Sequence, residues 1–75
     1  MSDTKRTFNN QMIDELESAN YFGEDRDDSE LELIRDMWVS QMKSRGWNIG
    51  DVIEDEDTFD YDAASSLQIA IESVG

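Results

Sequence analysis

The chain has 75 residues, of which nineteen are acidic and six basic, giving a formal net charge of −13. This length allows one domain, near the lower size at which a hydrophobic core is self-sufficient. The charge excludes ordinary nucleic-acid binding, which requires a face of Lys and Arg. Cys and His are absent, which excludes disulfides, metal sites built on thiolate or imidazole, and the usual catalytic nucleophile and general base.

The chain nevertheless has the composition of a folded, soluble protein. It contains seven aromatic residues and regularly spaced aliphatic ones, which argues against disorder despite the charge. No apolar run approaches the ~20 residues that cross a bilayer, and the basic pair Lys5 and Arg6 lacks the apolar segment of a signal peptide. We expect a cytoplasmic protein with a flexible tail over residues 1–8 and one acidic helical domain over residues 9–75.

A first helix is predicted over residues 9–21. Its apolar residues recur at helical spacing, namely Phe8, Met12, Leu16 and Ala19. Asn9 or Asn10 is expected to cap its start, because both side chains accept hydrogen bonds from free backbone amides. Gly23 is expected to follow its end, since glycine readily takes the left-handed conformation found there.

The clearest helix is predicted over residues 29–45. Ser29 and Glu32 form a capping-box pattern at its start, and Gly46 stands at the position of a left-handed stop. Its main apolar stripe consists of Leu31, Ile34, Trp38 and Met42. The stripe faces one neighbour, so this helix should organise the core.

Two further apolar residues widen the surface of this helix. Leu33 and Met37 are one turn apart and lie roughly 120° from the centre of the main stripe, counting about 100° per residue. Such a helix touches a second neighbour. We therefore expect Leu33 and Met37 to pack against another helix of the domain or to contact a second chain.

The remaining chain is predicted to contain an irregular segment and a last helix. Residues 46–57 include two glycines and allow a loop, a single helical turn or a short strand. A helix is predicted over residues 60–73, capped by Thr58 or Asp60. Its stripe comprises Phe59, Ala63, Leu67, Ala70 and Val74, while Ile69 points away from it. The predicted fold is all-α, with three helices in one small domain.

The clustered carboxylates do not match a metal site. An EF-hand loop requires a glycine at its sixth position. A loop that starts at Asp55 has Asp60 there, and one that starts at Asp25 has Glu30 there. We expect no metal and no cofactor. We also expect no enzyme activity, because a chain this small rarely builds the pocket that raises the pKa of a catalytic carboxyl.

The acids form two blocks that we predict to bind a partner. The first block spans residues 24–36, with candidate residues Asp25, Asp27, Asp28, Glu32 and Asp36. The second spans residues 51–62, with candidate residues Asp51, Glu54, Asp55, Glu56, Asp57, Asp60, Tyr61 and Asp62. Acids four residues apart on a helix lie about 6 Å apart along one edge, and successive phosphates of a DNA strand rise by about 3.4 Å each. Carboxylates held at fixed positions can therefore substitute for a phosphate backbone in a basic cleft.

In size, acidity and helical content the chain resembles the small phage-encoded inhibitors that block host restriction, CRISPR or DNA-repair enzymes. This resemblance implies a non-enzymatic protein that mimics nucleic-acid charge, acts in the cytoplasm of a bacterial host, and occupies a protein with a basic nucleic-acid-binding cleft. The likeness is one of physical character over the whole chain, with no family motif. No functional residue is therefore carried over from it.

Two other functions remain open. The chain is alternatively an interaction module or homodimer that uses Leu33, Met37 and Ile69, with the acids serving only solubility. A regulator of RNA polymerase would use the same acidic surface as a nuclease inhibitor. The target and the oligomeric state are not predicted by the sequence.

Overall fold

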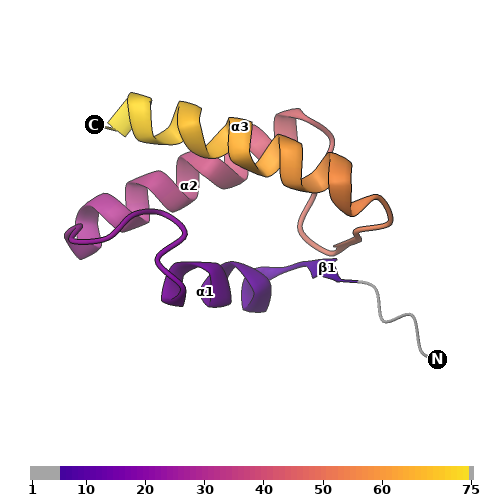
Figure 1. Cartoon of the computed structure of the whole chain (residues 1–75), viewed down its shortest axis with the longest axis horizontal. Helices are drawn as coiled ribbons and strands as arrows, with labels where there is room; N and C mark the ends of the chain where they lie inside the picture. Colours follow the sequence, from indigo (N-terminus) through magenta and orange to yellow (C-terminus); the bar gives the residue numbers. More distant parts are fainter. Residues whose placement is uncertain (1–5, 75) are drawn as a thin grey trace.

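The computed structural model describes residues 6–74, which form three helices and a two-stranded ribbon (Figure 1). In chain order the elements are β1 (Thr7–Phe8), α1 (Asn10–Ser18), α2 (Asp28–Ser44), β2 (Asp51–Val52) and α3 (Glu56–Val74). Helices α2 and α3 form the main helix pair and run in opposite directions, with α1 on one side of them. The predicted small all-α domain of three helices is confirmed.

Trp38, in the middle of α2, is fully buried at the centre of the core. Its ring makes edge-to-face contacts with Phe8, Tyr21 and Phe22, at centroid distances of 5.6, 5.7 and 5.4 Å. Each such pair contributes about 0.5–1.5 kcal/mol beyond the burial of area. The indole N–H also donates a hydrogen bond to the Ala63 carbonyl of α3, at 3.0 Å. One side chain therefore joins β1, the loop after α1, α2 and α3.

The two-stranded ribbon includes residues that were predicted to belong to a flexible tail. Its strands are antiparallel, with Thr7 opposite Val52 and Phe8 opposite Asp51. The Phe8 side chain is completely buried, so the gain from placing a large ring in the core holds the preceding backbone against β2. The flexible tail predicted over residues 1–8 is thus wrong for β1, while residues 1–5 lie outside the described chain.

The first two helices begin at or near the predicted residues. The Asn9 side chain accepts a hydrogen bond from the Met12 backbone amide at 2.9 Å, which confirms Asn9 as the cap of α1. Helix α2 begins at Asp28, with Asp27 as its N-cap and no side-chain capping bond. The capping box predicted at Ser29 is wrong, because that residue already lies inside the first turn.

Helix α3 starts four residues earlier than predicted, so that Glu56 and Asp57 form part of its first turn. The Asp55 carboxylate accepts hydrogen bonds from the Thr58 amide at 3.2 Å and the Thr58 hydroxyl at 2.8 Å. Asp55 rather than either predicted cap therefore fixes the start at Glu56. Acids are also favoured in a first helical turn by the helix dipole. Of the conformations left open for residues 46–57, a short strand is present, followed by this first turn.

Both of the first two helices end in the same backbone motif. After Ser18 the chain turns through Asn20, which has a left-handed φ of 61°, and after Ser44 it turns through Gly46, with φ 100°. In each case the next amide returns to a carbonyl of the last turn at 2.9 Å. The stop at Gly46 is confirmed. The predicted stop at Gly23 is wrong, because asparagine tolerates the left-handed conformation and ends α1 sooner.

Candidate interaction surface

Arg35 of α2 clamps two acids of α1. Its guanidinium lies 2.7 Å from the Asp14 carboxylate and 2.8 Å from that of Glu17, and its side chain is 27% exposed. Burial alone would lower the pKa of Arg35, but the hydrogen bonds to Glu17 and Asp14 raise it above its ordinary value. This base therefore serves to attach α1 to α2.

The other arginines are used in the same way. Every arginine within residues 6–74 pairs with a carboxylate, the remaining pairs being Arg6–Glu56 at 3.4 Å, Arg26–Glu30 at 3.5 Å and Arg45–Asp62 at 3.6 Å. Surface pairs of this kind contribute little to stability individually. Their consequence for the surface is larger, because internal pairing neutralises most of the few bases and leaves the acids outside these pairs to set the potential.

In the second predicted block, Asp62 is held inside the fold. Its carboxylate accepts a hydrogen bond from the Trp47 indole N–H at 2.9 Å and faces the Arg45 guanidinium, and its side chain is only 17% exposed. Asp51 likewise accepts the Asn48 backbone amide at 2.9 Å, which closes the turn before β2. These two predicted partner-binding residues therefore carry structural bonds.

Asp55 and Glu56 of the same block also have structural partners. The hydrogen bonds from Thr58 hold the pKa of the Asp55 carboxyl below its usual value. Glu56 pairs with Arg6, whose guanidinium also lies 5.8 Å from the centroid of the Phe59 ring. Together these contacts attach the start of β1 to the start of α3.

The rest of the second block is exposed. Glu54, Asp57 and Asp60 are all accessible, and the Tyr61 side chain is 72% exposed. Tyr61, one of the residues predicted to bind a partner, is the largest apolar group that the structure leaves open among these acids.

The first predicted block has a different character. Its five candidate acids are all exposed, namely Asp25, Asp27, Asp28, Glu32 and Asp36. In the described part of the chain, none of their side chains makes a hydrogen bond or an ion pair. Asp28, Glu32 and Asp36 follow one another at four-residue spacing in α2, which aligns them as a row along one edge, about 6 Å apart in axial rise. We call these three residues the α2 acid row.

The two acid blocks lie at opposite ends of the molecule. Because α2 and α3 are antiparallel, the start of α2 and the start of α3 are separated along the long axis (Figure 1), whose extent is 41 Å. The structure therefore does not join the predicted residues 24–36 and 51–62 into one continuous acidic surface. Each block has to be considered as a separate contact region.

An apolar groove borders the α2 acid row. It has a volume of about 480 Å³ and is lined by Leu33, Asp36, Met37, Ser40, Ser73 and Val74. Leu33 is 57% exposed, whereas Met37 and Val74 are half-buried. Asp36 lines the groove and belongs to the row, so an acidic edge and an apolar recess lie next to each other on α2. We call this recess the α2–α3 groove.

Ile69 does not belong to this groove. It lies on α3 and is 37% exposed, but it is not among the residues that line the recess. Of the apolar interface predicted from Leu33, Met37 and Ile69, only Leu33 and Met37 line the groove. Val74 of α3 lines it with them. Val74 was assigned to the core by its spacing, and only the packing of α3 against α2 shows that it lines a surface recess.

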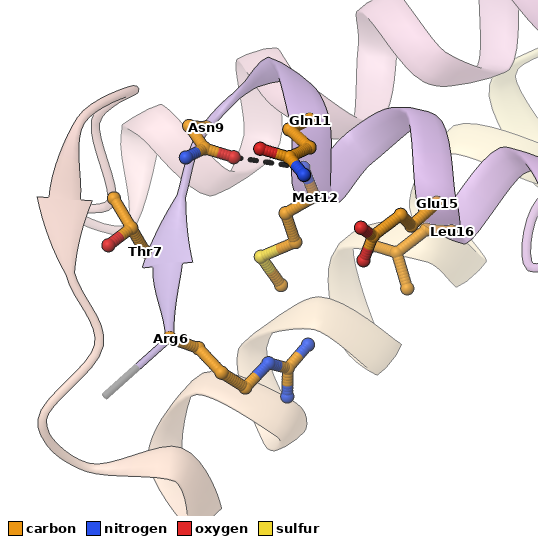
Figure 2. Close-up of a pocket in the computed structure, with 7 residues that line it drawn as sticks. All are labelled: Arg6, Thr7, Asn9, Gln11, Met12, Glu15 and Leu16. Atoms are coloured by element: carbon orange, nitrogen blue, oxygen red, sulfur yellow. Dashed lines mark hydrogen bonds between the residues drawn. The ribbon is translucent and has the colours of Figure 1, made fainter. Parts of the chain in front are cut away.

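A second hollow lies beside β1 and α1 (Figure 2). Its lining residues are Arg6, Thr7, Asn9, Gln11, Met12, Glu15 and Leu16, around a volume of about 480 Å³. Figure 2 shows the Arg6 side chain reaching away from β1 toward α3. Its guanidinium donates a hydrogen bond to the Glu56 carboxylate of α3 at 3.4 Å. Among the described residues of the lining, Glu15 is the only other charged group, and these residues supply no paired acid and base for catalysis.

No metal site emerges among the described residues. Within residues 6–74 no three acids converge in a way that would hold a cation. Over the same residues, no helix is long and apolar enough to span a bilayer.

Comparison with protein-family models, curated proteins and solved structures finds no significant match. Function is therefore inferred from the chemistry of this chain's own surface.

Proposed function

We propose that this protein is a small, non-enzymatic inhibitor that presents the α2 acid row to a basic nucleic-acid-binding cleft and so displaces DNA or RNA. The observation that carries the proposal is the row itself, made of Asp28, Glu32 and Asp36, exposed and without internal partners. A restriction, CRISPR or DNA-repair enzyme is the class of target we propose, with RNA polymerase as another protein of the same chemistry. If the protein is phage-encoded, it acts in the bacterial cytoplasm.

The distribution of charge supports this proposal. The arginines are consumed by ion pairs within the fold, and several acids of the α3 end are consumed by caps and ring contacts. Acids with no role in the fold oppose it by mutual repulsion. Because the row contributes no bond to the described part of the fold, we interpret it as serving an interaction.

The rigidity of the helix that carries the acid row also supports the proposed function. The row lies on a 17-residue helix that is held in place by another face, which buries Ile34, Trp38 and Met42. Carboxylates on such a helix hold their spacing, so binding does not require a flexible chain to be ordered. The absence of His and Cys supports a role other than catalysis.

Competition with DNA tests the proposal. A fluorescent DNA duplex is bound to each of a restriction endonuclease, a Cas9-type nuclease, a uracil-DNA glycosylase and RNA polymerase, and the protein is titrated in. We expect displacement from at least one of them, weakening steeply between about 50 mM and about 200 mM salt as charges are screened. Heparin serves as the polyanion control. The proposal is wrong if, at low salt, heparin displaces the duplex from all four targets whereas this protein displaces it from none of them.

Self-association is the second candidate function, and the apolar groove is the observation that favours it. Two copies would then meet through Leu33 and Met37, with the acids only maintaining solubility. Each copy would bring a charge of −13, so this association should tighten with added salt. Sedimentation of the protein at low and moderate salt distinguishes the candidates, because a dimer that forms only at higher salt supports self-association.

A further inference from the structure

We infer that the α2–α3 groove is a docking site for a basic amphipathic segment of the partner protein, which inserts an apolar side chain between Leu33, Met37 and Val74 and places Lys or Arg side chains against the α2 acid row. This inference rests on the proposed function and deepens it, because it names the chemistry of the partner and the contact that adds apolar burial to charge attraction.

The composition of the groove identifies the apolar half of the contact. Leu33 exposes 57% of its surface, and it lies one turn from Met37, so the two side chains form a continuous apolar strip on α2. Val74 of α3 lines the other side. Burying a Leu-sized side chain in such a recess supplies the affinity that exposed charge pairs lack, since screened pairs contribute little. Met37 adds an adaptable wall, because methionine fits differently shaped partners.

The charge around the groove identifies the polar half of the contact. The only ionisable residue in the groove lining is Asp36, and no basic residue lies in the last turn of α3, which forms the far wall. The negative end of the α3 dipole is therefore not neutralised by a base in its own last turn. Of the acid row, Asp36 alone lines the groove, and Glu32 and Asp28 follow it at successive turns of α2 toward the hollows that they share with Arg35. A segment with positive charge beside its apolar residue complements this surface, whereas an acidic or neutral segment does not.

The same charge argues against a second copy of the chain as the occupant. Two molecules that met at the groove would bring the Asp36 carboxylate of each α2 to the contact, with no basic residue among the described residues of either lining. Like charges that face each other across an interface are strongly unfavourable. The occupant is therefore a segment of opposite charge.

A designed peptide tests this inference. The probe is a synthetic amphipathic helical peptide of about 18 residues with Leu on one face and Lys and Arg on the other. A second peptide keeps every charge and replaces each Leu by Ser. We expect the first peptide to bind at least about tenfold more tightly than the second, which corresponds to the burial of one Leu side chain.

Matched variants of the protein locate the contact. Leu33→Gln removes the most exposed apolar residue of the groove and should weaken binding of the Leu peptide about tenfold. The control is Val52→Gln, because Val52 is 51% exposed, lies on β2 and is not among the residues that line the groove. This control should bind like the parent protein. Circular dichroism and thermal melting check that both variants remain folded.

The outcomes separate the inference from the proposed function. Equal binding of the two peptides, or of Leu33→Gln and the parent, overturns the groove as a docking site even if the protein displaces DNA from a target. If Leu33→Gln binds the Leu peptide more weakly than the parent does, but the parent displaces DNA from no target, the groove stands as a docking site and the inhibitor proposal is overturned. A parent protein that dimerises through the groove, with Leu33→Gln monomeric in sedimentation, overturns the basic segment as the occupant.

Discussion

The two ends of the molecule have similar acidity but use it differently. At the start of α3, Asp55 caps the helix, Glu56 pairs with Arg6, and Asp62 binds Trp47 and Arg45. At the start of α2, the carboxylates of the acid row have no partner within the described chain. Local sequence density of acids therefore does not distinguish an acid that holds the fold from one that faces solvent. The bonding partner of each carboxylate makes that distinction.

The largest effect is expected from Asp62→Ala at the α3 end. The substitution leaves the Trp47 indole N–H without its acceptor and Arg45 without its carboxylate. We expect the free energy of unfolding to fall by about 2 kcal/mol, typical of a lost hydrogen bond to a charged group. Urea unfolding followed by tryptophan fluorescence measures this. The control is Asp60→Ala on the same helix, whose exposed side chain should change stability little, and equal losses in the two variants would contradict a structural role for Asp62.

A smaller loss is expected from Arg35→Gln. The variant breaks both ion pairs that attach α1 to α2 and frees Asp14 and Glu17. Because Asp14 is largely exposed, the pairs are partly screened and the expected loss is about 1 kcal/mol. Thermal melting at low and high salt checks it. The difference between the variant and the parent should shrink at high salt, and a difference that grew with salt would exclude an ion-pair origin.

Acid pH should weaken the α3 end through Asp55. The pKa of its carboxyl is lowered in the folded state by the hydrogen bonds from Thr58. The stabilising contribution of the Asp55 carboxylate is therefore fully present above the ordinary pKa of an aspartyl side chain. It is lost as the pH falls through the lower pKa that this group has in the folded state. The protection of the amides in the first turn of α3, measured relative to their intrinsic exchange rate at each pH, should fall over that range. Asp55→Asn keeps a capping side chain without the titration and should flatten the response of this turn; an unchanged response would assign it to another group.

The smallest effect on stability is expected from neutralising the α2 acid row. The triple variant Asp28→Asn, Glu32→Gln, Asp36→Asn removes no hydrogen bond or ion pair of the described fold. It changes the net charge from −13 to −10 and so reduces self-repulsion, although Asp28 loses a favourable interaction with the helix dipole. Thermal melting should therefore show a midpoint equal to or slightly above that of the parent. A clear drop would mean that the row holds the fold.

Local signals in the sequence predicted the helices well. The stripe of Ile34, Trp38 and Met42, the cap at Asn9 and the stop at Gly46 all depend on neighbours a few residues away, and the structure confirms them. The errors at helix starts have a shared cause. Ser29, Thr58 and Asp60 all have side chains that suit a cap, but which oxygen meets a free amide depends on where tertiary packing starts the helix.

Long-range features were beyond reach of the sequence. The pairing of β1 with β2 joins Thr7 to Val52 and Phe8 to Asp51, which are 45 and 43 positions apart, and nothing local marks residues 7–8 as a strand. The bond from Trp47 to Asp62 and the clamp by Arg35 are of the same kind. For the candidate site, the acids and Leu33 were identified by composition and spacing, but the separation of the two blocks follows only from the antiparallel packing of α2 and α3.

The most direct test compares two variants of equal net charge in the DNA competition experiment. One neutralises the α2 acid row, and the other neutralises three exposed acids of α3, by Asp57→Asn, Asp60→Asn and Glu72→Gln; each has a charge of −10, from −13 plus three. We predict that the α2 variant displaces DNA at least about tenfold less effectively than the parent, while the α3 variant remains close to the parent. Equal losses would show that only total charge matters, and would contradict a specific role for the row on α2.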